Sequence, residues 1–292
     1  MLYRLISGNK RVFKALGMED GHEVLVTPRK TLLYNFGPLF IGDIVEIDKE
    51  DTIVKAQERK NLLIRPRVAN LDYAIVVAST FEPEFSSYLL DKFLCYLNFC
   101  RIPAIVVFTK MDKLNSEELK TIETYKNYYE SIGFASFMTN KYDPETVQPI
   151  KELIKGKTIA FMGQTGAGKS SLINTIDEDF NRGIGDYSKA LGRGKHKTKE
   201  VIFFKYQGGL IGDTPGFSSL EFSLLNINAQ DLSRIYPGYE KYALKCYYND
   251  CMHISEKDCK VIEAIKENKI SKEGYANYQK MLKEIKEGKK NG

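Results

Sequence analysis

The stretch Lys157–Ile176, which reads KTIAFMGQTGAGKSSLINTI, decides the fold of this chain. It opens with the apolar run Thr158–Met162, which is typical of a buried strand, and Ser171–Ile176 begins a helical pattern. Between the two lies Gly163–Ser170, a full match to the pattern G-x-x-x-x-G-K-S. The sequence therefore predicts a strand, a phosphate-binding loop and a helix in this order.

The residue types of this loop suit the phosphates of a nucleotide. Glycines let successive backbone N–H groups turn toward phosphate oxygens, and the start of the helix adds the positive end of its dipole. Lys169 would place its ammonium on the β- and γ-phosphates, and Ser170 would offer its hydroxyl to Mg²⁺. The alternative is a chance glycine-rich turn, but the strand and the helix on either side favour a nucleotide site.

Length and composition limit the class of protein. The chain has 292 residues, 43% of them hydrophobic, which predicts about two domains or three small ones. No apolar run approaches the ~20 residues that span a bilayer, and the N-terminus lacks the apolar segment of a signal peptide. We therefore expect a cytoplasmic protein without membrane contact. The net charge of +5 is mild, so anionic partners must be sought in local clusters.

Short strands separated by glycine and proline turns fill residues 1 to about 67. Strands at this spacing predict a small closed barrel, and a five-stranded OB barrel fits the size. Such barrels often bind nucleic acid. The strand candidates are Glu23–Thr27, Thr31–Tyr34, Asp43–Ile47 and Thr52–Ala56.

A mostly basic cluster ends this region. With Glu58 as its one acid, it allows two interpretations, a solvated strand edge or a contact to RNA. Its members are Lys55, Arg59, Lys60, Arg65 and Arg67.

From about residue 68 the pattern changes to alternating strands and helices. Asp72–Ser79 and Ala104–Phe108 are apolar runs of the kind that form strands covered on both faces, and Ser87–Phe99 between them is helical. This alternation predicts an α/β fold, a mostly parallel sheet with helices on both faces. Cys95 and Cys100 lie in the first helical pattern, where we expect them to be core residues.

Two further motifs follow apolar runs, where open α/β sheets bind ligands. Asp213–Gly216 reads DTPG, and after a phosphate loop it looks like the D-x-x-G element of GTPases, with Asp213 near Mg²⁺ and the N–H of Gly216 near the γ-phosphate. Thr109–Asp112 reads TKMD and looks like the [NT]-K-x-D element that selects guanine. Asp112 would accept hydrogen bonds from N1–H and the amino group of guanine, and Lys110 would lie along the base. The alternative is an aspartate that caps the next helix.

Three cysteines and one histidine lie within fourteen residues near the C-terminus. They follow the spacing C-x4-C-x-H-x5-C, a complete tetrahedral ligand set for a structural Zn²⁺. The alternative is three buried thiols beside a surface histidine. The predicted ligands are Cys246, Cys251, His253 and Cys259.

In ordinary GTPases the phosphate loop comes first, the D-x-x-G element second and the N-K-x-D element last. Here the order is permuted, because Thr109–Asp112 precedes Gly163–Ser170 and Asp213–Gly216 comes last. In this order, and in its zinc-ligand spacing, the sequence resembles the ribosome small-subunit-dependent GTPase A family (RsgA/YjeQ type) over its whole length. The resemblance implies three domains: an OB barrel at 1–67, a circularly permuted P-loop GTPase domain at 68–227 and a helical zinc-binding domain at 228–292. It also implies a GTPase that the small ribosomal subunit stimulates and that acts late in the maturation of that subunit.

The resemblance also assigns roles to single residues. Thr198 matches the switch threonine that completes the Mg²⁺ shell, and His196 matches a histidine proposed to position the attacking water. Thr109 stands where Asn is commoner, which removes an amide from the base site. The implied GTP/GDP contacts are Gly163, Gln164, Thr165, Gly166, Ala167, Gly168, Lys169, Ser170 and Ser171 at the phosphates, Asp213 and Gly216 at the γ-phosphate, and Thr109, Lys110, Asp112, Thr139 and Asn140 at the base.

The expected partners are the small ribosomal subunit and its rRNA, with the protein itself monomeric. The basic loop Asn181–Lys199 and the barrel would contact rRNA, whose phosphates and shape dominate recognition. One alternative is a nucleotide-gated RNA-binding module in which hydrolysis is incidental. Another is an ATP-driven P-loop enzyme, in which Asp112 would only cap a helix.

Overall fold

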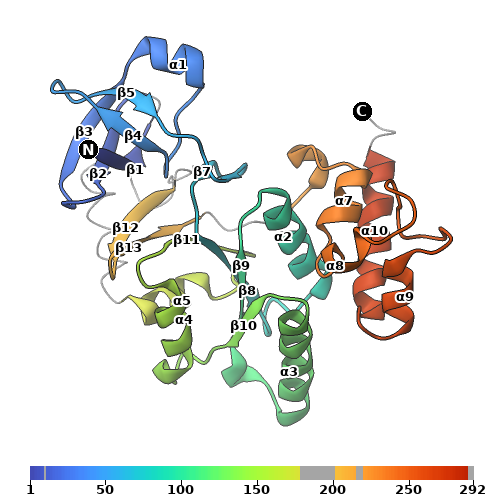
Figure 1. The fold of residues 1–292 in the computed structure, drawn as a ribbon. Helices are drawn as coiled ribbons and strands as arrows, with labels where there is room; N and C mark the ends of the chain where they lie inside the picture. The colour runs from blue at the N-terminus through green and yellow to red at the C-terminus, as the bar shows by residue number, and fades with distance from the viewer. Residues whose placement is uncertain (10, 178–200, 215–219, 289–292) are drawn as a thin grey trace. The chain divides into compact units, whose positions relative to one another are not determined.

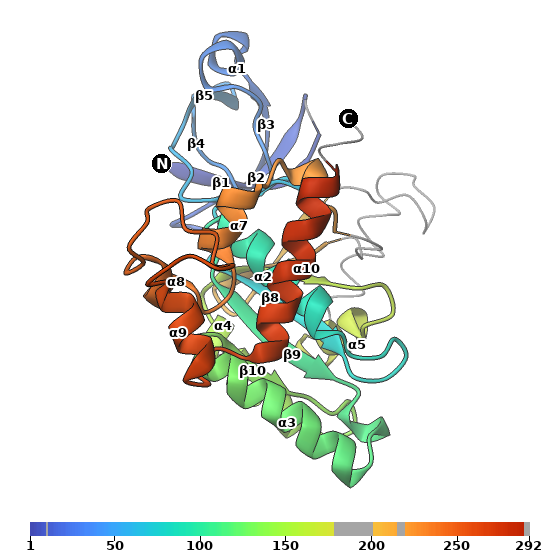
Figure 2. The same cartoon turned by 90° about the vertical axis from the view of Figure 1, so that its right-hand side faces the viewer.

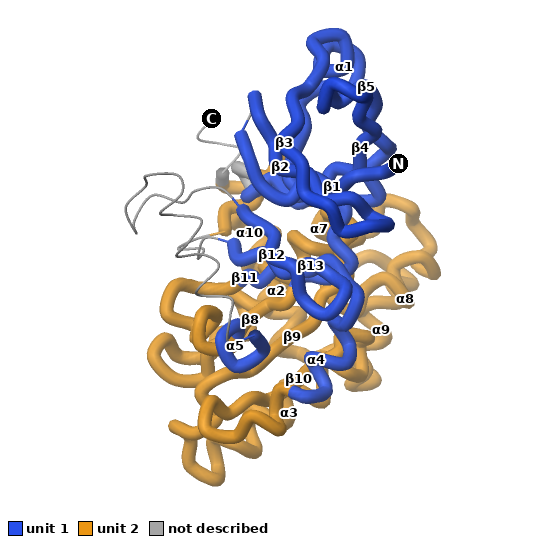
Figure 3. Tube along the Cα trace, turned by 90° about the vertical axis from the view of Figure 1, so that its left-hand side faces the viewer, with its two compact units in different colours: residues 1–74, 148–162, 173–215 blue, residues 75–147, 163–172, 216–292 orange. Residues whose placement is uncertain are grey.

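The structure, a computed structural model, describes residues 1–9, 11–177, 201–214 and 220–288. The chain folds into two compact units, each built from segments that are separate in the sequence (Figure 3). The first consists of Met1–Ala74, Gln148–Met162 and Ile173–Pro215, and the second of Ile75–Val147, Gly163–Leu172 and Gly216–Gly292. The predicted domain boundaries after residues 67 and 227 stay a prediction.

The N-terminal strands close into a barrel, as the sequence predicts (Figure 1). The strand order is β1-β2-β3-β5-β4, with β4 pairing back to β1. Leu5, Val26 and Ile53 fill its centre and are fully buried. The strands are β1 Leu2–Gly8, β2 Phe13–Gly17, β3 Glu23–Pro28, β4 Ile44–Ile47 and β5 Thr52–Ala56.

Between β3 and β4 lies the helix α1, Lys30–Phe36, so the prediction of a strand at Thr31–Tyr34 was wrong. None of its residues is buried, so packing does not select between helix and strand here. Local signals do. Pro28 ends β3, and Gly37 ends the helix with a φ of 87° while its N–H donates to Leu33 O.

A six-stranded sheet has the order β10-β9-β8-β11-β13-β12. β10 runs parallel to β9 and β11 parallel to β13, whereas β12 is antiparallel to β13. The predicted mostly parallel sheet is therefore confirmed, with one antiparallel edge strand. Its strands are β8 Tyr73–Ser79, β9 Ala104–Thr109, β10 Ala135–Met138, β11 Thr158–Gly163, β12 Ile202–Tyr206 and β13 Gly209–Asp213, and a two-stranded ladder joins β6 Leu62–Leu63 to β7 Val68–Ala69.

Helices accompany these strands, and capping signals explain where two of them begin. Ser86 accepts from the N–H of Leu89 at the start of α2, and Asn115 forms a capping box with Glu118 at the start of α3. Cys95 is fully buried in α2, as predicted for a core residue. The helices are α2 Ser87–Phe99, α3 Ser116–Ser131, α4 Gln148–Ile154 and α5 Lys169–Ile176, with short 3₁₀ turns at η1 Met111–Lys113, η2 Pro144–Val147 and η3 Phe222–Leu225.

The C-terminal part of the second unit is helical, and within this unit α10 packs against α2 and α7 (Figure 2). The buried rings of Tyr236, Tyr239 and Tyr278 form its core, with ring centroids 4.6–5.4 Å apart. Its helices are α7 Ala229–Ile235, α8 Glu240–Ala243, α9 Lys260–Lys266 and α10 Lys272–Gly288. In the described part of the chain, no helix has both the length and the apolar character needed to cross a membrane.

Candidate functional site

The predicted phosphate loop joins β11 to α5, as the sequence indicates. Gly166 and Gly168 have φ angles of 80° and 89°, in the left-handed region that favours glycine. A Cβ at Gly163 would lie 2.5 Å from the carbonyl oxygen of Val77, so a side chain is excluded there as well. The loop backbone therefore has the shape for which its glycines are needed, and Lys169 begins the helix.

The TKMD motif is tied directly to this loop. The hydroxyl of Thr109, at the end of β9, donates to Ala167 O at 2.6 Å. The ammonium of Lys110 donates to Gly166 O at 2.7 Å and to the carbonyl of Glu82. The structure thus brings the predicted base-selecting element and the phosphate loop together.

These contacts give Thr109 a role that the motif alone does not show. In the sequence, threonine at this position means only that the base site lacks an amide. In the structure its hydroxyl bonds the loop carbonyl, and a Cβ at Gly168 would come within 3.3 Å of that hydroxyl. Threonine and glycine therefore fit closely at this point. Asp112 lies on η1 with its side chain only 9% exposed.

Thr139 and Asn140 follow the neighbouring strand β10, which pairs with β9 in the register Met138–Phe108. Thr139 donates to Phe108 O from both its backbone N–H and its hydroxyl, at 2.8 and 3.1 Å. The backbone N–H of Asn140 donates to the hydroxyl of Thr146 at 3.1 Å. The pair therefore lies beside the end of β9, and its contact to a base stays a prediction.

Asp213 is the last residue of β13, as the sequence predicts. It pairs in register with Phe161 of the parallel strand β11, and the hydroxyl of Thr214 donates to Phe161 O at 2.6 Å. Gly216, Thr198 and His196 lie outside the described residues, as does the basic loop that contains the last two.

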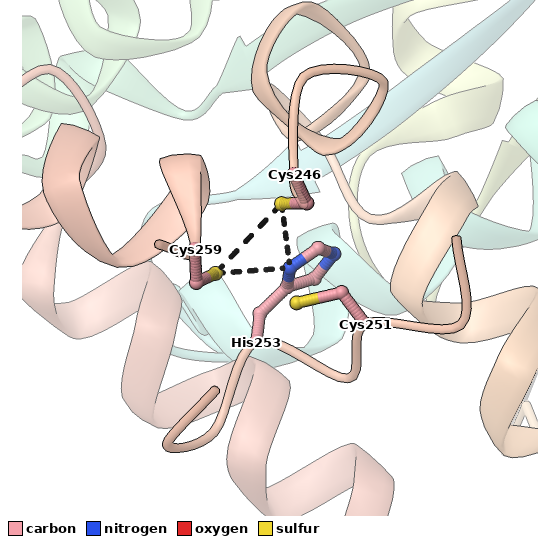
Figure 4. A group of neighbouring side chains, drawn as sticks. All are labelled: Cys246, Cys251, His253 and Cys259. Carbon is pink, nitrogen blue, oxygen red and sulfur yellow. Dashed lines mark hydrogen bonds between the residues drawn. The ribbon is translucent and has the colours of Figure 1, made fainter. Parts of the chain in front are cut away.

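Within the second unit the structure brings together the four predicted metal ligands (Figure 4). Their ligand atoms all lie within 4.8 Å of one another. Nδ1 of His253 is 3.7 Å from Sγ of Cys246 and 3.3 Å from Sγ of Cys259, and the two sulfurs are 3.9 Å apart. Ligands of one tetrahedral Zn²⁺ lie roughly 3.5–3.8 Å apart. The spacing and the Cys₃His donor set therefore fit a structural metal ion.

Surrounding groups prepare these side chains for a cation. Nε2 of His253 lies 3.1 Å from Ser233 O and can donate a hydrogen bond to it. In that tautomer Nδ1, which faces the sulfurs, carries no proton and can bind a cation. Burial lowers the pKa of His253, which also favours the neutral ring. Burial raises the pKa of the Cys251 thiol to about 12, so a cation is needed to hold it as a thiolate at neutral pH.

Glu256 supports the backbone around the Cys/His cluster, and ligand-spacing rules do not identify it. Its carboxylate accepts hydrogen bonds from the backbone N–H groups of Met252, Ile254 and Ser255, at 2.7–3.0 Å. Burial raises the pKa of this carboxyl, but the backbone hydrogen bonds outweigh that effect and hold the pKa below its usual range. In the sequence, an acidic residue three positions after His253, inside the ligand stretch, is the signal that could have identified it.

Three side chains of the basic cluster at the end of the barrel form ion pairs with nearby carboxylates. Arg59 forms a bidentate pair with the fully buried carboxylate of Asp43, with its Nε 2.6 Å from Oδ1. Lys55 pairs with Glu46 at 3.0 Å, and Lys60 pairs with Asp72. Arg59 is therefore held by a buried carboxylate, whereas Lys55 and Lys60 are 63% and 49% exposed in their ion pairs, and RNA contact by the cluster stays a prediction.

Comparison with known proteins connects these features. The family model described as RsgA GTPase matches residues 56–223. A small ribosomal subunit biogenesis GTPase RsgA from Latilactobacillus sakei is 39% identical over 253 residues, 85% of this chain and 84% of that protein. RsgA 2 from Oceanobacillus iheyensis is 37% identical over 285 residues, 94% of this chain and 96% of that protein. This chain belongs to the RsgA GTPase family.

Two solved structures extend the similarity to the whole fold of this family member. YjeQ from Thermotoga maritima has a TM-score of 0.81 at 27% identity, covering 97% of this chain and 98% of that one. YloQ, described as a circularly permuted GTPase, has a TM-score of 0.80 at 30% identity, covering 98% and 95%. The predicted permuted fold is therefore confirmed, and family membership makes the chain a GTP hydrolase.

Proposed function

We propose that this GTPase binds the small ribosomal subunit and acts in its late maturation, hydrolysing GTP to GDP and phosphate with stimulation by the subunit. The names of the relatives, small ribosomal subunit biogenesis GTPase RsgA, support the biological part. The hydrogen bonds from Thr109 and Lys110 to the carbonyls of the phosphate loop are the observation that carries the chemical part. They link an aspartate suited to guanine with a loop suited to phosphates.

In this proposal the loop backbone from Gly163 to Ser171 binds the phosphates and Asp112 selects guanine. Ser170 and Thr198 hold Mg²⁺, with Asp213 nearby, and the ion neutralises charge on the phosphates when bound. Lys169 stabilises the charge that develops on the transferred group, and His196 orients the attacking water. A Zn²⁺ in the Cys₃His cluster stabilises the C-terminal helices without taking part in the reaction.

The proposed partner surface is the basic loop Asn181–Lys199, which would meet rRNA phosphates when the protein, a cytoplasmic monomer in this proposal, docks on the subunit. The pairing of Arg59 with the buried carboxylate of Asp43 supports this loop over the cluster at the end of the barrel. Because the loop also carries His196 and Thr198, contact with rRNA and completion of the catalytic site would be one event.

The test is GTP turnover with and without purified small ribosomal subunits over a series of salt concentrations. We expect stimulation that declines as salt rises, because counterion release drives contacts to phosphate. Lys169→Ala serves as the control that removes turnover under both conditions. Turnover that subunits leave unchanged would contradict the proposal.

The competing function, a nucleotide-gated RNA-binding module, is separated by His196→Ala. For an enzyme that uses His196, stimulated turnover falls while GDP affinity stays the same. Unaltered turnover would exclude the water-positioning role. Competition of GDP against ADP for the protein tests the third possibility, since preference for ADP would exclude Asp112 as a guanine ligand.

A further inference from the structure

Asp91, on α2, is a buried carboxylate that the proposed reaction does not use. Its side chain is held by hydroxyl and amide groups of three other segments, and the residue is only 3% exposed. Tyr129 of α3 donates to Oδ1 at 2.8 Å, whereas Tyr236 and Asn277 approach Oδ2 at 2.7 and 2.8 Å. Among the described residues, no cationic side chain hydrogen-bonds to this carboxylate.

The two short contacts of the Tyr236 hydroxyl indicate whether the carboxyl group of Asp91 carries a proton. The phenol oxygen of Tyr236 lies 2.7 Å from Oδ2 of Asp91 and 2.5 Å from the carbonyl oxygen of Gly274 in α10. One phenol proton cannot serve both acceptors well, because they are separate groups on separate helices. If Asp91 is ionised, one of the two short contacts joins oxygens with no proton between them.

A proton on Asp91 removes this conflict. The acid then donates from Oδ2 to the oxygen of Tyr236, and Tyr236 donates to Gly274 O. Asn277 still donates to Oδ2, and its second amide hydrogen reaches Ser87 Oγ at 3.1 Å. In this neutral state each of the two short oxygen–oxygen contacts at Tyr236 contains one proton.

The groups around Asp91 also favour the neutral acid. Burial, together with the nearby charge of Glu273, raises its pKa to about 6 against the lowering effect of its three hydrogen bonds. Lys92, one residue along α2, is 2.9 Å from the carboxylate of Glu284 and so is paired elsewhere. The other titratable groups that interact with this carboxyl are Cys95 on α2, Tyr125, Tyr128 and Tyr129 on α3, Tyr236 after α7 and Glu273 on α10.

We propose that Asp91 is a proton-operated latch between α2 of the nucleotide-binding part and α10 of the C-terminal helices. In the protonated state it closes the relay through Tyr236 to Gly274. Loss of the proton breaks one link of the relay and loosens the packing of α10. Docking of the metal-cluster region on the GTPase region is therefore tighter at mildly acidic pH than at neutral pH.

The direction of this pH dependence follows from the linkage between protonation of Asp91 and stability of the docked state. A carboxyl whose folded pKa lies above its unfolded value stabilises the docked state at low pH and loses that contribution as pH rises toward the folded pKa. With a pKa of about 6 in the docked state and about 4 when exposed, the opening of α10 should become about tenfold more frequent between pH 5 and pH 7.

The experiment measures amide hydrogen exchange of α10 in the full-length protein at pH 5 and pH 7, corrected for intrinsic exchange rates. We expect about tenfold less protection of α10 at pH 7, with the amides of β9 as an internal reference that changes little. Asp91→Asn is the matched variant, because its side chain has the size of the acid but cannot ionise. It should remove the pH dependence and leave the metal cluster and Glu273 unchanged.

A second variant keeps the proposal testable if Asp91→Asn does not fold. Tyr236→Phe retains the buried carboxyl but lacks the relay oxygen, so α10 at pH 5 should be no better protected than wild type at pH 7. Equal protection of wild-type α10 at both pH values would overturn the latch. So would an undiminished pH effect in Asp91→Asn, or a change in β9 equal to that in α10.

Discussion

The phosphate loop with its base-selecting motif and the Cys/His cluster both gather polar groups for a ligand, but they are assembled differently. The four cluster ligands come from one stretch of fourteen residues, Cys246–Cys259. The predicted nucleotide site joins Thr109–Asp112 to Gly163–Ser170, segments about fifty residues apart that meet because each lies at the end of a strand.

The two sites also differ in what holds them in place. In the nucleotide site, hydroxyl and ammonium donors already bond the loop carbonyls, so the protein itself supplies the framework. In the cluster, three thiols and an imidazole face one another closely, and burial opposes the charge that thiolates would carry. We infer that the nucleotide site is preorganised by the sheet, whereas the cluster depends on its metal.

The largest expected effect is therefore loss of the cluster. Cys259→Ser, or removal of the metal with a chelator, should abolish stoichiometric zinc and unfold the α7–α10 region, since metal binding of on the order of 10 kcal/mol is also folding energy. Metal analysis and helical circular dichroism provide the measurement. Cys100→Ala, at a buried cysteine outside the cluster, is the control that should retain zinc. If the C-terminal region stays folded without metal, the cluster does not depend on its metal and the proposed difference between the two sites is wrong.

Asp112→Asn should give the next largest effect, confined to the nucleotide site. It removes the carboxylate that accepts two hydrogen bonds from guanine, which should weaken GDP binding by about 100-fold, or about 3 kcal/mol. The amide can instead donate to the 2-oxo group of xanthine, so xanthosine diphosphate should bind better than to wild type. Titration calorimetry measures both nucleotides, with Glu117→Gln on exposed α3 as the control. Unchanged GDP affinity would exclude Asp112 as a guanine ligand.

The smallest effect is expected from Thr109→Val, which keeps the shape of the side chain and removes its hydroxyl. Loss of the bond to Ala167 O should weaken GDP binding by roughly fivefold, about 1 kcal/mol. Thr109→Ser keeps the hydroxyl and should bind GDP nearly as well as wild type. If Val and Ser variants bind equally, the framework of the nucleotide site does not depend on this hydrogen bond, and its preorganisation needs another source.

The strand and helix predictions succeed where the pattern fits one period only and fail where a short run fits both periods. Ser87–Phe99 and Thr52–Ala56 are found as expected. The four-residue strand Ala135–Met138 has no clear pattern of its own and is specified by pairing with β9. Thr31–Tyr34 fits either period and becomes helical because Gly37 ends it in a left-handed conformation.

The sequence alone was sufficient to predict the chemistry of both sites, because that prediction depends on residue types at fixed spacing. The glycines and lysine of Gly163–Ser170, the aspartate of Thr109–Asp112 and the Cys/His spacing are all recognisable without the fold. Only the tertiary structure decided how these segments support one another. The bond from Thr109 to Ala167 and the contacts of Tyr236 with Asp91 and Gly274 join residues far apart in the chain. Such contacts arise from strand register and helix packing, which no local pattern encodes.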